Sequence, residues 1–174
     1  MLNLKRTQRS MIYGRQRAFG TAGRAKMIEM DGKMCIFCRI ASGELPASVV
    51  YEDEQTIAFL DIQPINPGHV LVVPKAHAES MVDLSPDDAA QVMVVGQVMD
   101  KALRQSQLRC EGVNFFLADG KAAGQEVSHV HLHVFPRFEG DDFSLNLEST
   151  DRSTPGREQL NETAKKLKQA VDSL

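Results

Sequence analysis

The sequence predicts an α+β fold with a mainly antiparallel sheet of about five strands and two helices. Short runs rich in β-branched residues follow one another as hairpins and meanders, and two stretches of helical period stand apart from them. No glycine-rich fingerprint of an alternating β/α nucleotide-binding fold is present in the sequence. At 174 residues, 43% of them hydrophobic, the chain can bury one core, so we expect a single folded domain.

The first predicted elements are a hairpin and a central strand. Residues 49–52 and 55–60 are two apolar runs separated by two acidic residues, which is typical of a short hairpin. Residues 61–68 contain two prolines and a glycine and are therefore expected to form a loop. Residues 69–73 are apolar and β-branched, which indicates a strand in the middle of the sheet.

The first helix is predicted from Ser85 to about residue 106. Serine is a favoured N-cap, and the proline that follows it suits the first helical position. Apolar side chains then recur at helical spacing and form the expected buried stripe, which consists of Val92, Val95, Met99 and Ala102.

Two further strands and a second helix complete the prediction. Residues 113–118 are expected to form a strand, a turn with two glycines follows, and residues 128–135 form another strand that ends at Pro136. Residues 141–174 are expected to contain an irregular segment and then a helix, opened by Pro155, that packs on the same domain. We therefore place the folded core at residues 34–140.

Charge is unevenly distributed along the chain. Residues 1–28 carry 7 basic side chains and no acid, which leaves 13 of the 20 basic residues against all 23 acidic ones in the remainder. An acidic body argues against duplex nucleic acid as the main partner. We expect residues 1–33 to be a disordered basic extension, with an Arg-rich transit peptide and a start codon placed too far upstream as alternatives. No apolar run reaches the ~20 residues of a spanning helix, so no membrane partner is expected.

Three of the five histidines lie in the sequence His-Val-His-Leu-His at residues 129–133. On a strand, side chains alternate between faces, so His129, His131 and His133 share one face while Val130 and Leu132 enter an apolar layer. Imidazoles aligned in this way can ligate a metal ion or provide a nucleophile with helpers. The spacing alone leaves both interpretations open.

Nearby polar residues suit a nucleotide phosphate. Gly124 permits close backbone approach to a bulky anion, and Gln125 offers both a donor and an acceptor just before the histidines. The carboxylate of Asp61, at the end of a predicted strand, can accept two ribose hydroxyls. His69 is expected to have a structural role, hydrogen-bonded beneath the strand that carries the three histidines.

Three segments carry a resemblance to a known family. Residues 124–136 resemble the signature of the histidine-triad (HIT) nucleotide-binding superfamily, and residues 60–75 resemble its other hallmark segment. Residues 35–51, which open with Cys-Ile-Phe-Cys, are similar to bacterial members of the Hint-like branch. The resemblance implies a HIT-like fold over residues 34–140, with the sheet continued across a homodimer.

The resemblance also implies roles for the site residues. The central histidine of the triad is the nucleophile in that family, which assigns His131. His133 and Gln125 would act as catalytic helpers that contact phosphate or the leaving group. The nucleotide would be bound by the same three residues together with Asp61, Ile62 and Gly124.

A pair of cysteines at positions 35 and 38 is open to redox, metal-binding and accidental interpretations on its own. Several bacterial relatives bind zinc with such a pair and two histidines, and those positions are occupied here by His77 and His129. The resemblance therefore implies a closed structural zinc site of Cys35, Cys38, His77 and His129, with free thiols as the alternative. No organic cofactor is expected.

The predicted function is a hydrolase that acts at the α-phosphorus of AMP- or GMP-linked substrates, such as nucleoside phosphoramidates, through a nucleotidyl-histidine intermediate. Alternatives are a nucleotide-binding signalling module with little turnover, a dinucleoside polyphosphate hydrolase, and a zinc hydrolase that uses all three triad histidines as ligands. A nucleotidyl transferase is a further alternative, although relatives with that activity usually replace the residue at position 133 by Gln. We expect a cytoplasmic protein, or a mitochondrial one if residues 1–33 are a transit peptide.

Overall fold

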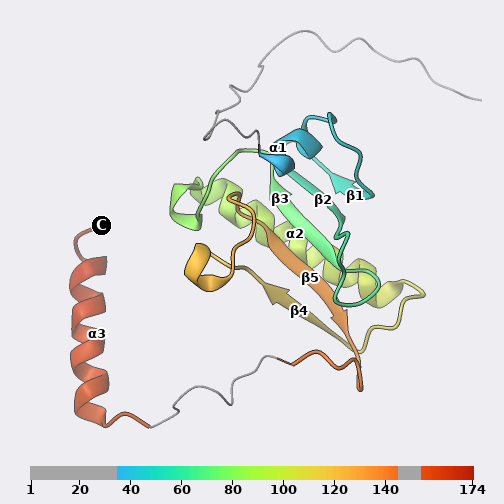
Figure 1. Cartoon of the computed structure of the whole chain (residues 1–174). Coiled ribbons are helices and arrows are strands. Elements are labelled where there is room, and N and C mark those ends of the chain that lie inside the picture. Colours follow the sequence, from blue (N-terminus) through green and yellow to red (C-terminus); the bar gives the residue numbers. More distant parts are fainter. Residues whose placement is uncertain (1–34, 145–153) are drawn as a thin grey trace, which may run out of the picture.

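The computed structural model describes residues 35–144 and 154–174, and its centre is a five-stranded sheet (Figure 1). Every strand pairing in this sheet is antiparallel, and the strand order is β1-β2-β3-β5-β4. The strands are β1 (Val49–Glu52), β2 (Thr56–Leu60), β3 (Val70–Pro74), β4 (Gly112–Phe116) and β5 (Leu132–Arg137). The predicted α+β class is confirmed.

The two faces of the sheet carry different helices. The long helix α2 (Pro86–Gln105) lies across one face, where its apolar stripe packs on β2, β3 and β5. The short helix α1 (Ile36–Ala41) covers part of the other face (Figure 1). Its Phe37 side chain packs against Ile57, Phe59 and neighbouring side chains. The prediction of two helices omitted α1, because six residues are too few to show a helical period.

The start of α2 was predicted correctly, whereas one position of its stripe was wrong. The Ser85 hydroxyl accepts a hydrogen bond from the backbone N–H of Asp88 at 3.0 Å, as expected of an N-cap. Val92, Val95 and Met99 are buried as predicted, but Ala102 is exposed and Leu103 is buried in its place. Both i+3 and i+4 neighbours of Met99 are compatible with a helical stripe, and the larger apolar side chain faces the sheet.

The strand that carries the end of the triad begins later than predicted. It runs over Leu132–Arg137 instead of residues 128–135, so His129 and His131 precede it. The expectation that Pro136 ends the strand is also wrong, since β5 continues through it, paired with β4. Pairing with β3 stops at Val134, so Pro136 lies where β5 has a single neighbour and a missing N–H is tolerated.

The C-terminal helix does not show the expected packing. The helix α3 (Arg157–Val171) has no buried residue, and Figure 1 shows it standing apart from the sheet and α2. Its apolar side chains, among them Leu160 and Leu167, are exposed. The segment before it, residues 145–153, lies outside the described residues, as do the predicted basic extension at residues 1–33 and residue 34.

Two single-turn 3-10 helices interrupt the loops: η1 (Met81–Asp83) precedes α2, and η2 (Lys121–Ala123) precedes the triad. In residues 35–144 and 154–174, no helix combines the length and apolar character needed to cross a membrane.

Candidate functional site

The triad histidines lie on the sheet face that α1 covers. Leu132 and Val134 point to the α2 face, where they join the main apolar cluster, so the intervening His133 points the other way. The rings of His131 and His133 are neighbours, with centroids 4.9 Å apart. The prediction that the histidines share one face and the aliphatic residues the other is thus borne out at this end of the triad.

The bonding of His131 defines which ring nitrogen is free to react. Its Nδ1 lies 2.7 Å from the backbone carbonyl oxygen of His129, and because a carbonyl only accepts, Nδ1 carries the proton. The lone pair of a neutral ring is then on Nε2, which has no hydrogen-bond partner among the described residues. The edge of the ring packs against Phe37 at a centroid distance of 5.1 Å, and the residue is 5% exposed. His131 is held in the tautomer that a nucleophilic Nε2 requires.

A chain of hydrogen bonds fixes the tautomer of His133 as well. The backbone N–H of Ile65 donates to Nδ1 of His69 at 3.2 Å, so the proton of the His69 ring is on Nε2. This Nε2–H donates to Nδ1 of His133 at 2.9 Å. The remaining proton of His133 is therefore on Nε2, where it can be donated to a ligand. The expected structural role of His69 is seen directly.

Burial favours the neutral forms of His133 and His69. Burial lowers the pKa of His133 from 6.5 to about 4, with smaller contributions from the nearby rings of His131 and His69. The pKa of His69 is also lowered, mainly by burial and against the pull of the Asp61 carboxylate. At neutral pH the Asp61 carboxylate and the His69 ring, 3.6 Å apart, are consequently not an ion pair.

Asp61 and Ile62 lie at the end of β2 beside these histidines. One carboxylate oxygen of Asp61 accepts the backbone N–H of Gln63 at 2.9 Å. The other lies 4.0 Å from Nδ1 of His133, beyond hydrogen-bond distance, and is available to accept a hydroxyl. The Ile62 side chain is 92% exposed, which leaves an apolar surface next to this carboxylate.

Gln125 is hydrogen-bonded to two other loops. Its Oε1 accepts the backbone N–H of Gly120 at 2.7 Å, and its Nε2 donates to the backbone carbonyl of Glu79 at 2.8 Å. A contact between this amide and a phosphate would have to replace one of these bonds. Gly124 has a φ of +89° and open space at its Cβ position, so the glycine is needed here for its left-handed backbone conformation.

Cys35, Cys38, His77 and His129 form a second cluster beside the triad. Their ligand atoms all lie within 4.8 Å of one another. The Nδ1 of His129 is 3.4 and 3.6 Å from the sulfurs of Cys35 and Cys38, and the Nδ1 of His77 is 3.3 Å from the Cys38 sulfur. The two Nδ1 atoms are 3.2 Å apart. Four atoms of types that can ligate a metal, from the start of α1, the loop after β3 and the start of the triad, thus surround one point.

These separations fit a tetrahedral metal ion. Zinc bonds of about 2.3 Å to sulfur and about 2.0–2.1 Å to nitrogen place neighbouring ligand atoms roughly 3.3–3.8 Å apart. The Nε2 of His129 lies 2.9 Å from the Pro74 carbonyl and must donate to it, so the Nδ1 lone pair faces the cluster. Without a cation, burial and then the neighbouring Cys35 raise the pKa of Cys38 to about 12. A cation is what makes thiolates stable at such a place.

Asp61, His69 and His133 also come together, but they fit a metal poorly. Their ligand atoms lie within 4.8 Å of one another. However, Nδ1 of His69 accepts a backbone N–H, and Nδ1 of His133 accepts the proton of His69. The ring lone pairs that a metal would need are already used, so His69 and His133 are a hydrogen-bonded pair with Asp61 beside them.

Sequence reasoning missed Phe37, which joins the two clusters. Its ring lies 6.0 Å from that of His129 and packs against His131 and Phe59 as well. The signal available was its position between the two cysteines, in a segment already singled out for its metal-binding residues.

Comparison with known proteins identifies the family. The profile of the HIT domain matches residues 42–140, so it includes the triad and excludes the two cysteines. An uncharacterised HIT-like protein of Methanocaldococcus jannaschii is 52% identical over 108 residues, which are 62% of this chain and 82% of the relative.

Two solved structures extend the similarity to the fold. A zinc-bound histidine triad family protein from Mycobacterium smegmatis is 42% identical, with a TM-score of 0.62, over 80% of this chain and 96% of that one. A histidine triad nucleotide-binding protein from Candida albicans is 30% identical, with a TM-score of 0.70, over 80% of this chain and 98% of that one. By its sequence, its fold and its three aligned histidines, this chain belongs to the histidine-triad (HIT) family.

Proposed function

We propose that this chain hydrolyses AMP- or GMP-linked conjugates, such as nucleoside phosphoramidates, through a covalent nucleotidyl-histidine at His131. The observation that carries the proposal is the bond from Nδ1 of His131 to the His129 carbonyl, which leaves Nε2 with a free lone pair. HIT proteins are generally nucleotide hydrolases, and the similar Candida albicans protein is described as nucleotide-binding.

The reaction consists of two displacements at phosphorus. The Nε2 lone pair of His131 attacks the α-phosphorus, the bond to the leaving group breaks, and the leaving group takes up a proton from water. Water then attacks the same phosphorus and the N–P bond breaks; the attacking water releases a proton to solvent, which replaces the one taken up by the leaving group, and the imidazole and the nucleotide are set free. A neutral imidazole needs no prior loss of a proton for the first step.

Neighbouring groups support the charge and position the nucleotide. The Nε2–H of His133 donates to a non-bridging phosphate oxygen, where charge develops in each transition state. The free oxygen of Asp61 accepts a ribose hydroxyl, and the exposed Ile62 side chain packs on the base. Gln125 changes partners from the Glu79 carbonyl to the phosphate or the leaving group.

The test is turnover of a panel of AMP conjugates, with intact-mass analysis of reactions quenched early. Wild type is expected to show a mass increase of one AMP on His131, and His131→Ala should lose both adduct and turnover. His133→Asn is the matched variant, because its amide oxygen still accepts the proton of His69 while the donor toward phosphate is lost; slower turnover with the adduct retained is expected. Full activity of His131→Ala would refute the nucleophile, and binding of AMP without turnover in wild type would favour the signalling module.

We also propose that the four-residue cluster holds zinc in a structural role. The proposal rests on the separations among Cys35, Cys38, His77 and His129, and a similar Mycobacterium smegmatis protein is described as zinc-bound. Four protein ligands leave no open position for water on the metal, so the ion would stiffen the fold and take no part in the chemistry. When bound, it supplies the positive charge that keeps both thiols deprotonated.

Metal content measured on purified protein tests this second proposal. Wild type should contain about one zinc ion per chain, Cys38→Ser should contain much less, and Cys110→Ser should match wild type because Cys110 lies outside the cluster. A chelator should lower the unfolding midpoint of wild type more than that of Cys38→Ser. Activity that disappears with zinc in a protein that stays folded would favour the zinc hydrolase instead.

We further propose a homodimer. The edge strand β4 exposes Phe115 and Phe116, and the outer face of α2 exposes Met93, Val94 and Val98. A row of apolar side chains beside an open sheet edge is expected to be covered by a second copy. Light scattering during gel filtration should give twice the chain mass, and Phe116→Glu should shift it toward the monomer.

A further inference from the structure

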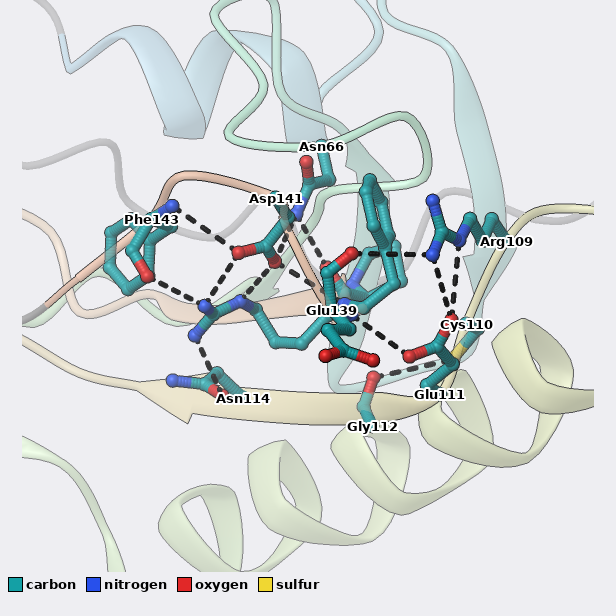
Figure 2. Close-up of polar contacts among 12 residues, drawn as sticks. Asn66, Arg109, Cys110, Glu111, Gly112, Asn114, Glu139, Asp141 and Phe143 are labelled. Carbon is teal, nitrogen blue, oxygen red and sulfur yellow. Dashed lines mark hydrogen bonds and ion pairs between the residues drawn. The ribbon is translucent and has the colours of Figure 1, made fainter.

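The carboxylate of Asp141, just after β5, is surrounded by hydrogen-bond donors (Figure 2). Its side chain is 4% exposed, and Arg137 approaches it with Nε and a terminal nitrogen at 2.5 and 2.8 Å. The backbone N–H groups of Phe138 and Phe143 donate to it at 3.3 and 3.2 Å, and the Asn66 side chain does so at 3.0 Å. These bonds, that of Arg137 above all, hold the pKa of Asp141 well below its usual range. We call Arg137, Asp141 and Asn66 the Asp141 clamp.

Asn66 is the member of this clamp that belongs to the loop between β2 and β3. The residue is 6% exposed, and its Nδ2 donates both to Asp141 and, at 2.9 Å, to the backbone carbonyl of Pro136. Both amide hydrogens are therefore used to hold a loop residue against a segment about seventy positions later in the chain. An unbonded side-chain amide buried at this place would be unfavourable, so the orientation of Asn66 depends on its acceptors.

The turn that Asn66 opens fixes the ring of His69. The backbone carbonyl of Asn66 accepts the N–H of His69 at 3.0 Å, and the N–H of Ile65 donates to the ring at 3.2 Å. The same loop returns to Asp61, whose N–H donates to the His69 carbonyl at 2.9 Å. The turn is closely packed, since a Cβ at Gly68 would lie 2.7 Å from a methyl carbon of Leu108.

We propose that Asp141 is a positioning residue for the reaction: through Asn66 it fixes the turn at residues 65–69, and thereby the tautomers of His69 and His133. The consequence is that the Nε2–H of His133 points outward, where the proposed function needs a donor to phosphate. The expected effect on turnover rests on the proposed function. The link from the Asp141 clamp to the tautomers of His69 and His133 rests on the hydrogen-bond geometry alone.

The chain offers a matched control beside the clamp. Arg109 stacks on the ring of Phe138 at 4.3 Å and pairs with Glu111 at 3.0 Å, and the other oxygen of Glu111 accepts the N–H of Glu139 at 2.9 Å (Figure 2). This second ion pair holds the same segment that follows β5, yet it has no bond to Asn66. Weakening it should loosen the segment without reaching the histidines.

The experiment uses the full chain with Asp141→Asn, Asn66→Ala, the double variant and Glu111→Gln. Asp141→Asn places an amide where donors already converge, and Asn66→Ala cuts the link but keeps the ion pair. Nitrogen-15 NMR of the histidine rings reports each tautomer without any substrate. Steady-state turnover of adenosine 5′-phosphoramidate reports kcat and KM.

In wild type, His69 and His133 should both show the Nε2–H tautomer. Asp141→Asn and Asn66→Ala should each give mixed tautomers at His133 and a kcat lower by about tenfold, on the scale that small misplacements produce. The double variant should be no worse than either single one, because both act along one path. Glu111→Gln should leave the ring signals and kcat unchanged.

Unchanged ring signals in folded Asp141→Asn would overturn the inference, as would the same change in Glu111→Gln. If Asp141→Asn does not fold, Asn66→Ala decides, and wild-type ring signals in that variant overturn the inference. If the clamp variants show altered tautomers but the wild-type protein turns over no AMP conjugate, the role of the clamp is supported and the proposed function is refuted. Turnover that requires His131 but is unchanged in Asp141→Asn and Asn66→Ala would support the proposed function and refute the role of the clamp.

Discussion

Replacing His133 with Asn should make the stability of the protein less sensitive to acid. The side chain of His133 is 21% exposed, and burial, followed by the nearby rings of His131 and His69, lowers its pKa from 6.5 to about 4. The folded state therefore binds this proton more weakly than the unfolded chain. The stabilisation is complete above pH 6.5 and is lost as the pH falls from 6.5 toward 4.

The size of the effect follows from the shift. One pKa unit corresponds to about 1.4 kcal/mol, so a group that shifts from 6.5 to about 4 loses about 2.5 kcal/mol of stabilisation between pH 7.5 and 4.5. His133→Asn keeps an acceptor for the proton of His69 but cannot titrate. Its free energy of unfolding should consequently fall by about 2.5 kcal/mol less than that of wild type over this range.

Urea unfolding followed by circular dichroism at several pH values measures this difference. The titration of groups away from this cluster occurs in both proteins, so the difference between them reports His133 and its coupling to His131 and His69. Two curves of equal slope between pH 6.5 and 4.5 would refute the reasoning, since they would mean that the ring accepts a proton as readily in the folded protein as in the unfolded chain.

Three further predictions concern packing and capping. Gly96→Ala should lower the free energy of unfolding by up to about 2 kcal/mol, because crowding of the added Cβ, 2.8 Å from a methyl carbon of Leu132, outweighs the ~1 kcal/mol that alanine adds inside a helix; denaturant unfolding measures it, and a gain in stability would contradict it. Ser85→Ala should remove the helix cap and about 1 kcal/mol in the same assay, with Ser85→Asp close to wild type as the control. Leu103→Ala should lower the free energy of unfolding by about 2–5 kcal/mol, whereas Ala102→Ser should change it by less than about 0.5 kcal/mol, and comparable losses would mean that the stripe is misassigned.

Elements with a strong local signal could be predicted from the sequence. The Ser85 cap and the helical period place α2 to within a residue, and β-branched runs reveal β2 and β3. The short α1 could not be predicted in this way, because its single buried side chain, Phe37, gives no period. Ala102 and Leu103 were confused because both lie within the angular range that a helix can turn toward a sheet.

The packing of α3 could not be predicted from the sequence, for a different reason. A stripe that includes Leu160 and Leu167 predicts a helix, and the helix is present. The pattern does not predict which surface the apolar stripe contacts. In the described residues every residue of α3 is exposed. An amphipathic period thus determines that a face is apolar, while only the rest of the fold determines whether anything covers it.

The sequence by itself determined which residue types the candidate site contains. The spacing of His129, His131 and His133 predicted one shared face, and the pattern around them identified the family. Three equally spaced imidazoles are chemically alike, however, and their different roles depend on partners far away in the chain. The carbonyl of Pro74 turns a lone pair of His129 toward the cysteines, and the N–H of Ile65 acts through His69 on His133. Only the tertiary structure decided these roles, because a proton takes its place on one ring nitrogen according to the donors and acceptors that the folded chain brings to it.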